Sequence, residues 1–227
     1  MPFGNLEDEH RRNHFLPGEC LEIFHQSLSA LAFLHGRARP IAHRDIKPQN
    51  ILVEYRHPNR NPNYLRIKLS DFGLSKAGTL KTFCGSKTYL PPEVRNDDLR
   101  ENYTRAVDIW SLGVVLLRYA YALPYPGSGM GMKWCEQIVE AAHDWHSEGL
   151  IDILQHMLVI EPKERLSTTD CLRAASRLLS SSQDRSTTPT PAPCTAGYGA
   201  TMARSPEGQE PEEQETLRIS PRDVCMP

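Results

Sequence analysis

Apolar residues recur every three or four positions along several stretches of the chain, which is typical of amphipathic helices. From Pro17 to His35 this spacing predicts a long helix, and Gly36 is placed to end it. Residues 104–123 are apolar nearly all round, which indicates a helix buried in the centre of a domain. Shorter helical patterns occupy residues 132–145, 149–158 and 167–179, the last with Ser167 as its cap.

Two short runs, residues 51–54 and 65–69, are rich in β-formers, and the second alternates between apolar and polar positions. They predict two strands. Between them, residues 56–63 are rich in Pro and Asn and predict a loop longer than a tight hairpin needs. The polar segment 7–13 is expected to form a short exposed helix. The expected fold class is therefore mainly α, with one short β-hairpin.

From residue 180 onward Ser, Thr, Pro and Glu dominate, and no period of apolar residues survives. Such a composition cannot bury enough apolar surface to offset the entropy of ordering the chain. We therefore expect a folded domain over residues 1–179 and a disordered tail over residues 180–227. A chain of 227 residues is long enough for this arrangement.

The charges nearly balance, at 26 basic and 28 acidic residues, so electrostatics gives no reason to expect a nucleic-acid or membrane partner. The six cysteines are scattered without a Cys-x-x-Cys pair, which indicates reduced thiols in an intracellular protein. No secretory signal is recognisable, and the most apolar run, residues 109–117, is too short to cross a membrane. The cytoplasm, the nucleus or both are the expected locations.

Residues 43–50 read His-Arg-Asp-Ile-Lys-Pro-Gln-Asn and lie between the long helix and the first strand. This stretch resembles the catalytic loop of eukaryotic protein kinases. Phosphoryl transfer needs a carboxylate to orient the hydroxyl proton, a cation near the phosphate and an oxygen ligand for Mg²⁺. The resemblance implies these roles for Asp45, Lys47 and Asn50, in that order. The alternative is a polar loop that only caps neighbouring helices.

The second expected strand is followed by Asp71-Phe72-Gly73, which resembles the metal-binding triplet of the same family. The resemblance implies that Asp71 holds Mg²⁺ against the phosphates of ATP. It also implies that Leu52 forms the floor under the adenine ring. The residues expected to bind ATP or Mg²⁺ are thus Lys47, Asn50, Leu52 and Asp71, and the metal ligands among them are Asn50 and Asp71.

Residues 78–89 are polar and glycine-bearing, and Pro91-Pro92-Glu93 follows them. The segment is similar to the kinase activation segment, although that family usually has Ala-Pro-Glu at its end. Thr82 occupies the place of the phosphorylated threonine, and Arg44 is the usual partner of that phosphate. The resemblance therefore implies an upstream activating kinase. An unmodified loop threonine remains the alternative for Thr82.

Three further residues are expected to hold the fold. Asp108 is the one charged residue in the apolar run 107–117, so it should have partners. The resemblance implies that it accepts backbone hydrogen bonds from the catalytic loop. It also implies a buried ion pair between Arg165 and Glu93.

Together these motifs resemble the C-terminal lobe of a serine/threonine protein kinase, because Lys47 is typical of that type. If the comparison holds, the chain begins inside the hinge and is truncated at its N-terminus, since it contains no Gly-x-Gly-x-x-Gly loop. Two functions stay open. One is a kinase that transfers the ATP γ-phosphate to Ser or Thr of a protein substrate. The alternative is a catalytically inactive kinase-like lobe that acts as a binding or regulatory protein.

Overall fold

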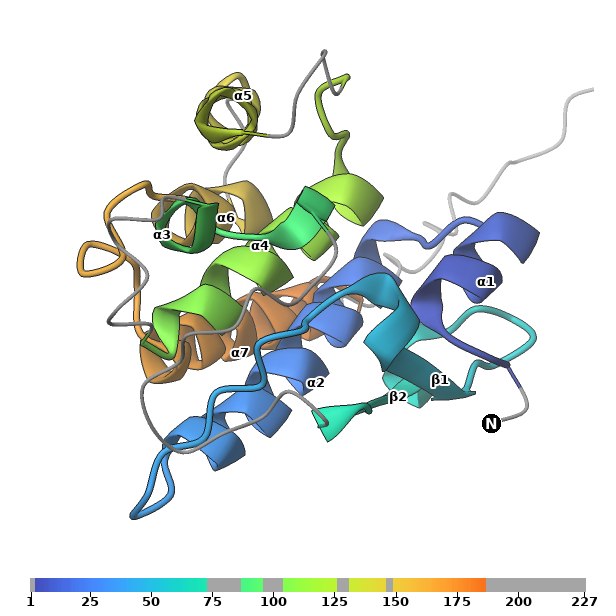
Figure 1. Cartoon of the computed structure of the whole chain (residues 1–227). Coiled ribbons are helices and arrows are strands. Elements are labelled where there is room, and N and C mark those ends of the chain that lie inside the picture. The colour runs from blue at the N-terminus through green and yellow to red at the C-terminus, as the bar shows by residue number, and fades with distance from the viewer. Residues whose placement is uncertain (1–2, 73–86, 96–103, 126–130, 146–148, 187–227) are drawn as a thin grey trace, which may run out of the picture. The chain divides into compact units, whose positions relative to one another are not determined.

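A computed structural model describes residues 3–72, 87–95, 104–125, 131–145 and 149–186, and this part of the chain is mainly helical with one small sheet (Figure 1). The helices are α1 (Leu6–Arg12), α2 (Pro17–His35), α3 (Pro92–Arg95), α4 (Ala106–Ala120), α5 (Met132–His143), α6 (Leu150–Met157) and α7 (Thr168–Ser186). The strands are β1 (Ile51–Tyr55) and β2 (Arg66–Leu69), and short 3₁₀ turns cover Pro48–Asn50, Pro62–Tyr64 and Lys87–Tyr89.

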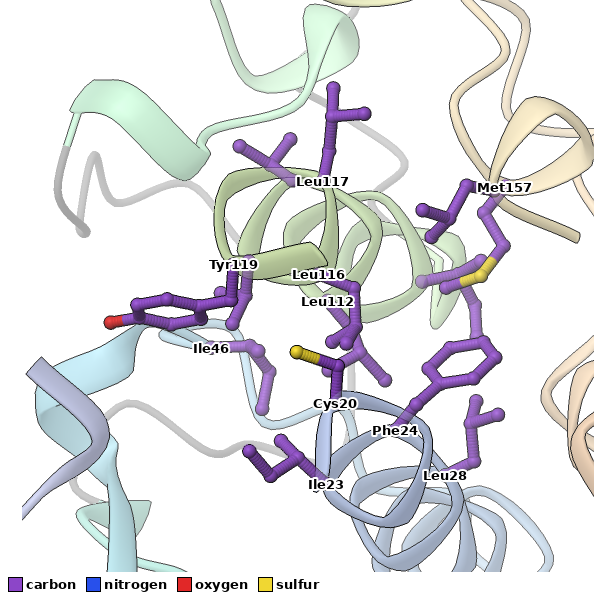
Figure 2. Close-up of a cluster of buried hydrophobic side chains, with 14 of the residues drawn as sticks. Cys20, Ile23, Phe24, Leu28, Ile46, Leu112, Leu116, Leu117, Tyr119 and Met157 are labelled. Carbon is purple, nitrogen blue, oxygen red and sulfur yellow. The ribbon is translucent and has the colours of Figure 1, made fainter. Parts of the chain in front are cut away.

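The apolar helix α4 forms the centre of the core, as its composition predicts. Buried side chains of α2, among them Cys20 and Phe24, face Leu112 and Leu116 of α4, and Met157 of α6 closes the same cluster (Figure 2). Each large apolar side chain buried in this way contributes about 1.5–3 kcal/mol to stability. The core therefore fixes α2 against α4, and both helices in turn support the loop that follows α2.

The β-hairpin is antiparallel and packs its apolar face on α2. Ile51 pairs with Leu69 and Val53 with Ile67, and the side chains of Ile51, Val53 and Ile67 are buried. Gln26 of α2 bonds to the second strand and to the residue before it: its side chain accepts from the Ile67 amide at 3.0 Å and donates to the Leu65 carbonyl at 2.8 Å. The hairpin is thus fixed to the helix that precedes residues 43–50.

The prediction that α1 is an exposed helix is wrong in one respect, because Leu6, Glu7 and Glu9 are buried. Glu9 accepts a 3.0 Å bond from Nη1 of Arg56, an arginine of the loop between the strands. The sequence predicts this segment only as a loop, rich in Pro and Asn and longer than a tight hairpin needs. Its first arginine is buried, so the loop fastens α1 to the rest of the domain.

Arg56 also makes two bonds to Glu19, from Nε at 2.7 Å and from Nη2 at 2.8 Å, and its guanidinium lies 4.8 Å from the centre of the Phe15 ring. Burial acts to raise the pKa of the Glu19 carboxyl, but the bonds from Arg56 and from the Leu16 amide outweigh it and lower that pKa. Glu19 is therefore held ionised, and the forked arginine is the group that makes its burial tolerable.

Helix α7 continues to Ser186, past the end expected at about Leu179. The prediction of disorder is therefore wrong for residues 180–186, and the remainder of the expected tail lies outside the described residues. Two serines near this end of the helix bond to helix carbonyls: the Ser180 hydroxyl donates to the Ser176 carbonyl at 3.1 Å, and the Ser182 hydroxyl donates to the Leu178 carbonyl at 2.8 Å. A serine-rich segment is typical of disorder, yet here it continues a helix that packs on α2.

Candidate active site

Two side chains of the loop after α2 donate to the carboxylate of Asp45. Lys47 Nζ donates to Asp45 Oδ2 at 2.6 Å, and Asn50 Nδ2 donates to the same oxygen at 2.9 Å. Asn50 Nδ2 also lies 2.8 Å from the Asp45 carbonyl, because the Pro48–Asn50 turn brings Asn50 back toward the aspartate. Asp45 is only 7% exposed, so its carboxylate is held by the protein rather than by water.

Asp108 of α4 accepts hydrogen bonds from the backbone of this loop. Asp108 Oδ2 accepts from the His43 amide at 2.8 Å, and Oδ1 accepts from the Arg44 amide at 2.7 Å. Arg44 has a φ of 75°, a left-handed conformation that costs a residue other than glycine about 1–3 kcal/mol and needs outside support. The fully buried carboxylate of Asp108 supplies that support, and Ile46 anchors the loop in the core.

The segment that carries Asp71 is tied to the same loop. Ser70 donates to the Asn50 carbonyl from its amide at 2.9 Å and from its hydroxyl at 3.1 Å, and the Ser70 carbonyl lies 3.0 Å from His43 Nε2. The Phe72 ring lies against the His43 ring, with centroids 4.9 Å apart. Asp71 itself is exposed and also has a positive φ, of 62°. The end of β2 therefore lies beside Asn50.

The donor set at this point suits Mg²⁺. Asp71 offers carboxylate oxygens and Asn50 an amide oxygen, and hard oxygen ligands are those that Mg²⁺ prefers. Within the described ranges no group of three or more His, Cys, Asp or Glu side chains could hold a metal ion. Mg²⁺ at sites of phosphoryl transfer is commonly bound by one or two carboxylates together with the phosphates of the nucleotide. Leu52, on β1 beside Val53, is half-buried and offers an apolar surface.

A second polar centre lies around Arg165. Its Nη1 and Nη2 donate to the two oxygens of Glu93 at 2.7 Å each, and the guanidinium lies 5.1 Å from the centre of the Trp110 ring. Arg165 also donates to the carbonyls of Val159 and Ala106, at 2.8 and 3.0 Å. This ion pair connects α3 to α4 and to the segment before α7.

The comparisons with known proteins agree with this geometry. The family model described as "Protein kinase domain" matches residues 1–175. The chain is 37% identical over 171 residues to the serine/threonine-protein kinase cds1 of Schizosaccharomyces pombe, with 68% of this chain and 35% of the relative covered. It is 36% identical over 188 residues to the ovarian-specific serine/threonine-protein kinase Lok of Drosophila melanogaster, covering 77% of this chain and 38% of the relative.

This chain belongs to the serine/threonine protein kinase family. The membership of this family that its motifs predict is thereby confirmed. The chain spans between a third and two fifths of the length of the kinases cds1 and Lok. MAP kinase-activated protein kinase 2 of Drosophila melanogaster is a further relative, 34% identical over 175 residues, with 70% of this chain and 45% of that protein covered. No helix that the structure describes in this kinase chain is long and apolar enough to span a membrane.

One candidate residue of the kinase domain, Thr82, falls outside the residues described by the structure. Arg44, its expected partner, lies within them. Burial lowers the pKa of the Arg44 guanidinium, and the nearby carboxylate of Asp108 acts in the opposite direction.

Sequence reasoning missed the groups that hold the segment just before Glu93. Ser111 of α4 donates to the Tyr89 carbonyl at 2.8 Å, and Trp134 Nε1 of α5 donates to the Thr88 carbonyl at 3.0 Å. Ser111 carried a signal, because it is the second polar residue inside an otherwise apolar helix, one turn after Asp108. The sequence carries no such signal for Trp134, since an aromatic residue at an apolar position of α5 is typical of a core residue.

Proposed function

We propose that this chain is the catalytic part of an ATP-dependent protein kinase that transfers the γ-phosphate to a Ser or Thr hydroxyl of a protein substrate. One observation carries the proposal: Lys47 Nζ and Asn50 Nδ2 converge on a single oxygen of Asp45. A loop that only capped helices would not need a cation and an amide on one nearly buried carboxylate. The alternative, a kinase-like lobe without catalysis, is not favoured, since Asp45, Lys47, Asn50 and Asp71 are all present.

The roles of the side chains follow from their chemistry. Asp45, which accepts a hydrogen bond from Lys47, accepts or orients the proton of the attacking hydroxyl. Lys47 stabilises negative charge beside that carboxylate, and Asn50 and Asp71 would hold Mg²⁺ through their oxygens. Leu52 would lie under the adenine. Mg-ATP, when bound, supplies the phosphoryl group and the cation that neutralises its charge.

We propose the finer assignments on the same grounds. The described helical body corresponds to the C-terminal lobe of a kinase domain, because α4 supports both the catalytic loop and the segment near Glu93. An intracellular location is supported by Cys20, Cys135 and Cys171, which are free and buried. Burial raises the pKa of Cys135 to about 11, which keeps that thiol protonated and unreactive.

The test is transfer of labelled γ-phosphate from ATP to a mixed library of Ser, Thr and Tyr peptides, using the protein purified from its native source. We expect Mg²⁺-dependent labelling of Ser and Thr peptides, and removal of Mg²⁺ by a chelator should abolish it. Labelling that persists after chelation, or labelling that favours Tyr, would contradict the proposal. The mass of the purified protein, compared with the 25.7 kDa of these 227 residues, shows whether this chain or a longer one was assayed.

We further propose that an upstream kinase phosphorylates Thr82 and that Arg44 binds the phosphate. Thr82→Ala should then remove a roughly tenfold gain in activity that follows phosphorylation, since charge-assisted bonds to an arginine can order a loop. Thr79→Ala, in the same segment, is the matched control and should keep the gain. An unchanged response to the upstream kinase in Thr82→Ala would show that Thr82 is an ordinary loop residue.

A further inference from the structure

A chain of buried hydrogen bonds runs from the first residue of α7 to the catalytic loop. Thr168 Oγ1 lies 2.6 Å from His35 Nδ1, and His35 Nε2 lies 2.8 Å from Asp108 Oδ2. Thr168, His35 and Asp108 are 6%, 4% and 0% exposed. Asp108 in turn accepts the amides of the two residues before Asp45. The start of α7 is therefore connected to the catalytic loop through two side chains.

The direction of each bond follows from the groups involved. An ionised carboxylate can only accept, so His35 Nε2 must carry a hydrogen and donate to Asp108. In the imidazole tautomer with its hydrogen on Nε2, the other nitrogen is an acceptor. The Thr168 hydroxyl then donates to His35 Nδ1. In this arrangement the hydroxyl selects the tautomer that Asp108 needs.

We propose that Thr168 is a positioning residue for phosphoryl transfer: it orients His35, His35 orients Asp108, and Asp108 fixes the backbone that carries Asp45. The catalytic part of this inference rests on the proposed kinase function. Asp108 has to hold Arg44 in a left-handed conformation, so a carboxylate that turns by a small angle loses the geometry of the whole loop. A misplacement of about 1 Å at a reacting group can cost about a hundredfold in rate.

The position of Thr168 strengthens the inference. It lies three residues after Arg165, whose guanidinium holds Glu93. The short segment 165–168 thus bonds to Glu93 at one end and, through His35, to the catalytic loop at the other. One short segment therefore supports two parts of the proposed active site, the region of Glu93 and the catalytic loop. Substitution of Thr168 should disturb only the second anchor.

The decisive variant is Thr168→Val, which keeps the shape of the side chain and removes its hydroxyl. Nitrogen-15 NMR of the full chain should show His35 as the Nε2–H tautomer in the wild type, and a mixture of tautomers in the variant. Amide hydrogen exchange at His43 and Arg44 should accelerate by roughly tenfold, because the carboxylate that accepts these amides is less well held. Both measurements are independent of kinase activity.

The kinetic readout uses the peptide assay. Thr168→Val should lower kcat by about tenfold and leave the KM for peptide within about twofold, since the hydroxyl acts on the catalytic geometry and not on the substrate surface. Thr168→Ser keeps the hydroxyl and should restore kcat. Thr169→Val, an exposed neighbour, is the matched control for the substitution. Ser167→Ala is the control for α7 itself, because the Ser167 hydroxyl accepts from the Asp170 amide at 3.2 Å and caps the helix.

Several results would overturn the proposal. One is an imidazolium signal for His35 in the wild type, because both ring nitrogens would then donate. Unchanged exchange at His43 and Arg44 in Thr168→Val is another, and so is an equal loss of kcat in Ser167→Ala. A failure of the proposed kinase function is distinguishable, since it would show as the absence of Mg²⁺-dependent transfer in the wild type. The tautomer and exchange measurements would still decide whether Thr168 positions the loop.

Discussion

Replacement of Asp45 by asparagine is expected to lower kcat by about 10²–10⁴-fold, the range that a positioned general base contributes. The asparagine carbonyl oxygen can still accept the bonds from Lys47 and Asn50, so the loop should keep its shape. It cannot take up a proton at neutral pH, however, and it carries no charge. The loss should therefore appear in kcat rather than in the KM for ATP, and initial rates of labelled phosphate transfer at saturating ATP measure it.

Asp152→Asn is the matched control, because Asp152 lies exposed on α6. It should leave both kinetic parameters unchanged. Thermal unfolding of Asp45→Asn should follow that of the wild type, which separates a catalytic effect from a folding effect. If Asp45→Asn kept kcat within about threefold of the wild type, well below the contribution of a general base, another group would have to orient the hydroxyl proton.

The elements that the sequence predicts best are those defined by local patterns. Helix α2 has the predicted bounds, because Pro17 favours its first turn, Gly36 follows its end and its apolar spacing is regular. Helix α1 was misjudged because its burial depends on Arg56, whose partner Glu9 is 47 residues away in sequence. No local period contains that information. The end of α7 was misjudged for a related reason, since its exposed serines continue a helix that packs against α2.

The candidate site divides in the same way. Asp45, Lys47 and Asn50 lie within six residues, so their convergence could be expected from a short motif. His35 and Thr168 are 133 residues apart, and a lone histidine at the end of a helix gives no sign of its partners. Their relation to Asp108 became visible only when α2, α4 and α7 were placed together. Sequence motifs thus identify the candidate catalytic residues, and tertiary packing shows which residues support the loop that carries them.

Arg165→Ala is expected to lower the free energy of unfolding by about 3–5 kcal/mol, which is the usual cost of leaving one partner of a buried ion pair uncompensated. The Arg165 side chain is fully buried, and its removal would leave the Glu93 carboxylate, also buried, without its two 2.7 Å donors. A domain of this size is stable by only about 5–15 kcal/mol, so the variant should be partly unfolded at physiological temperature. Urea unfolding followed by circular dichroism measures the change.

Arg173→Ala is the control for this prediction, because Arg173 forms a 2.7 Å ion pair with Asp170 on the exposed surface of α7. Exposed pairs contribute little, so its unfolding midpoint should match that of the wild type. The double variant Arg165→Met with Glu93→Leu removes both charges and should recover much of the lost stability, since the desolvation cost disappears with them. If Arg165→Ala unfolded at the wild-type urea concentration, the pair would hold no part of the fold, and the bonds from Arg165 to backbone carbonyls would also be dispensable.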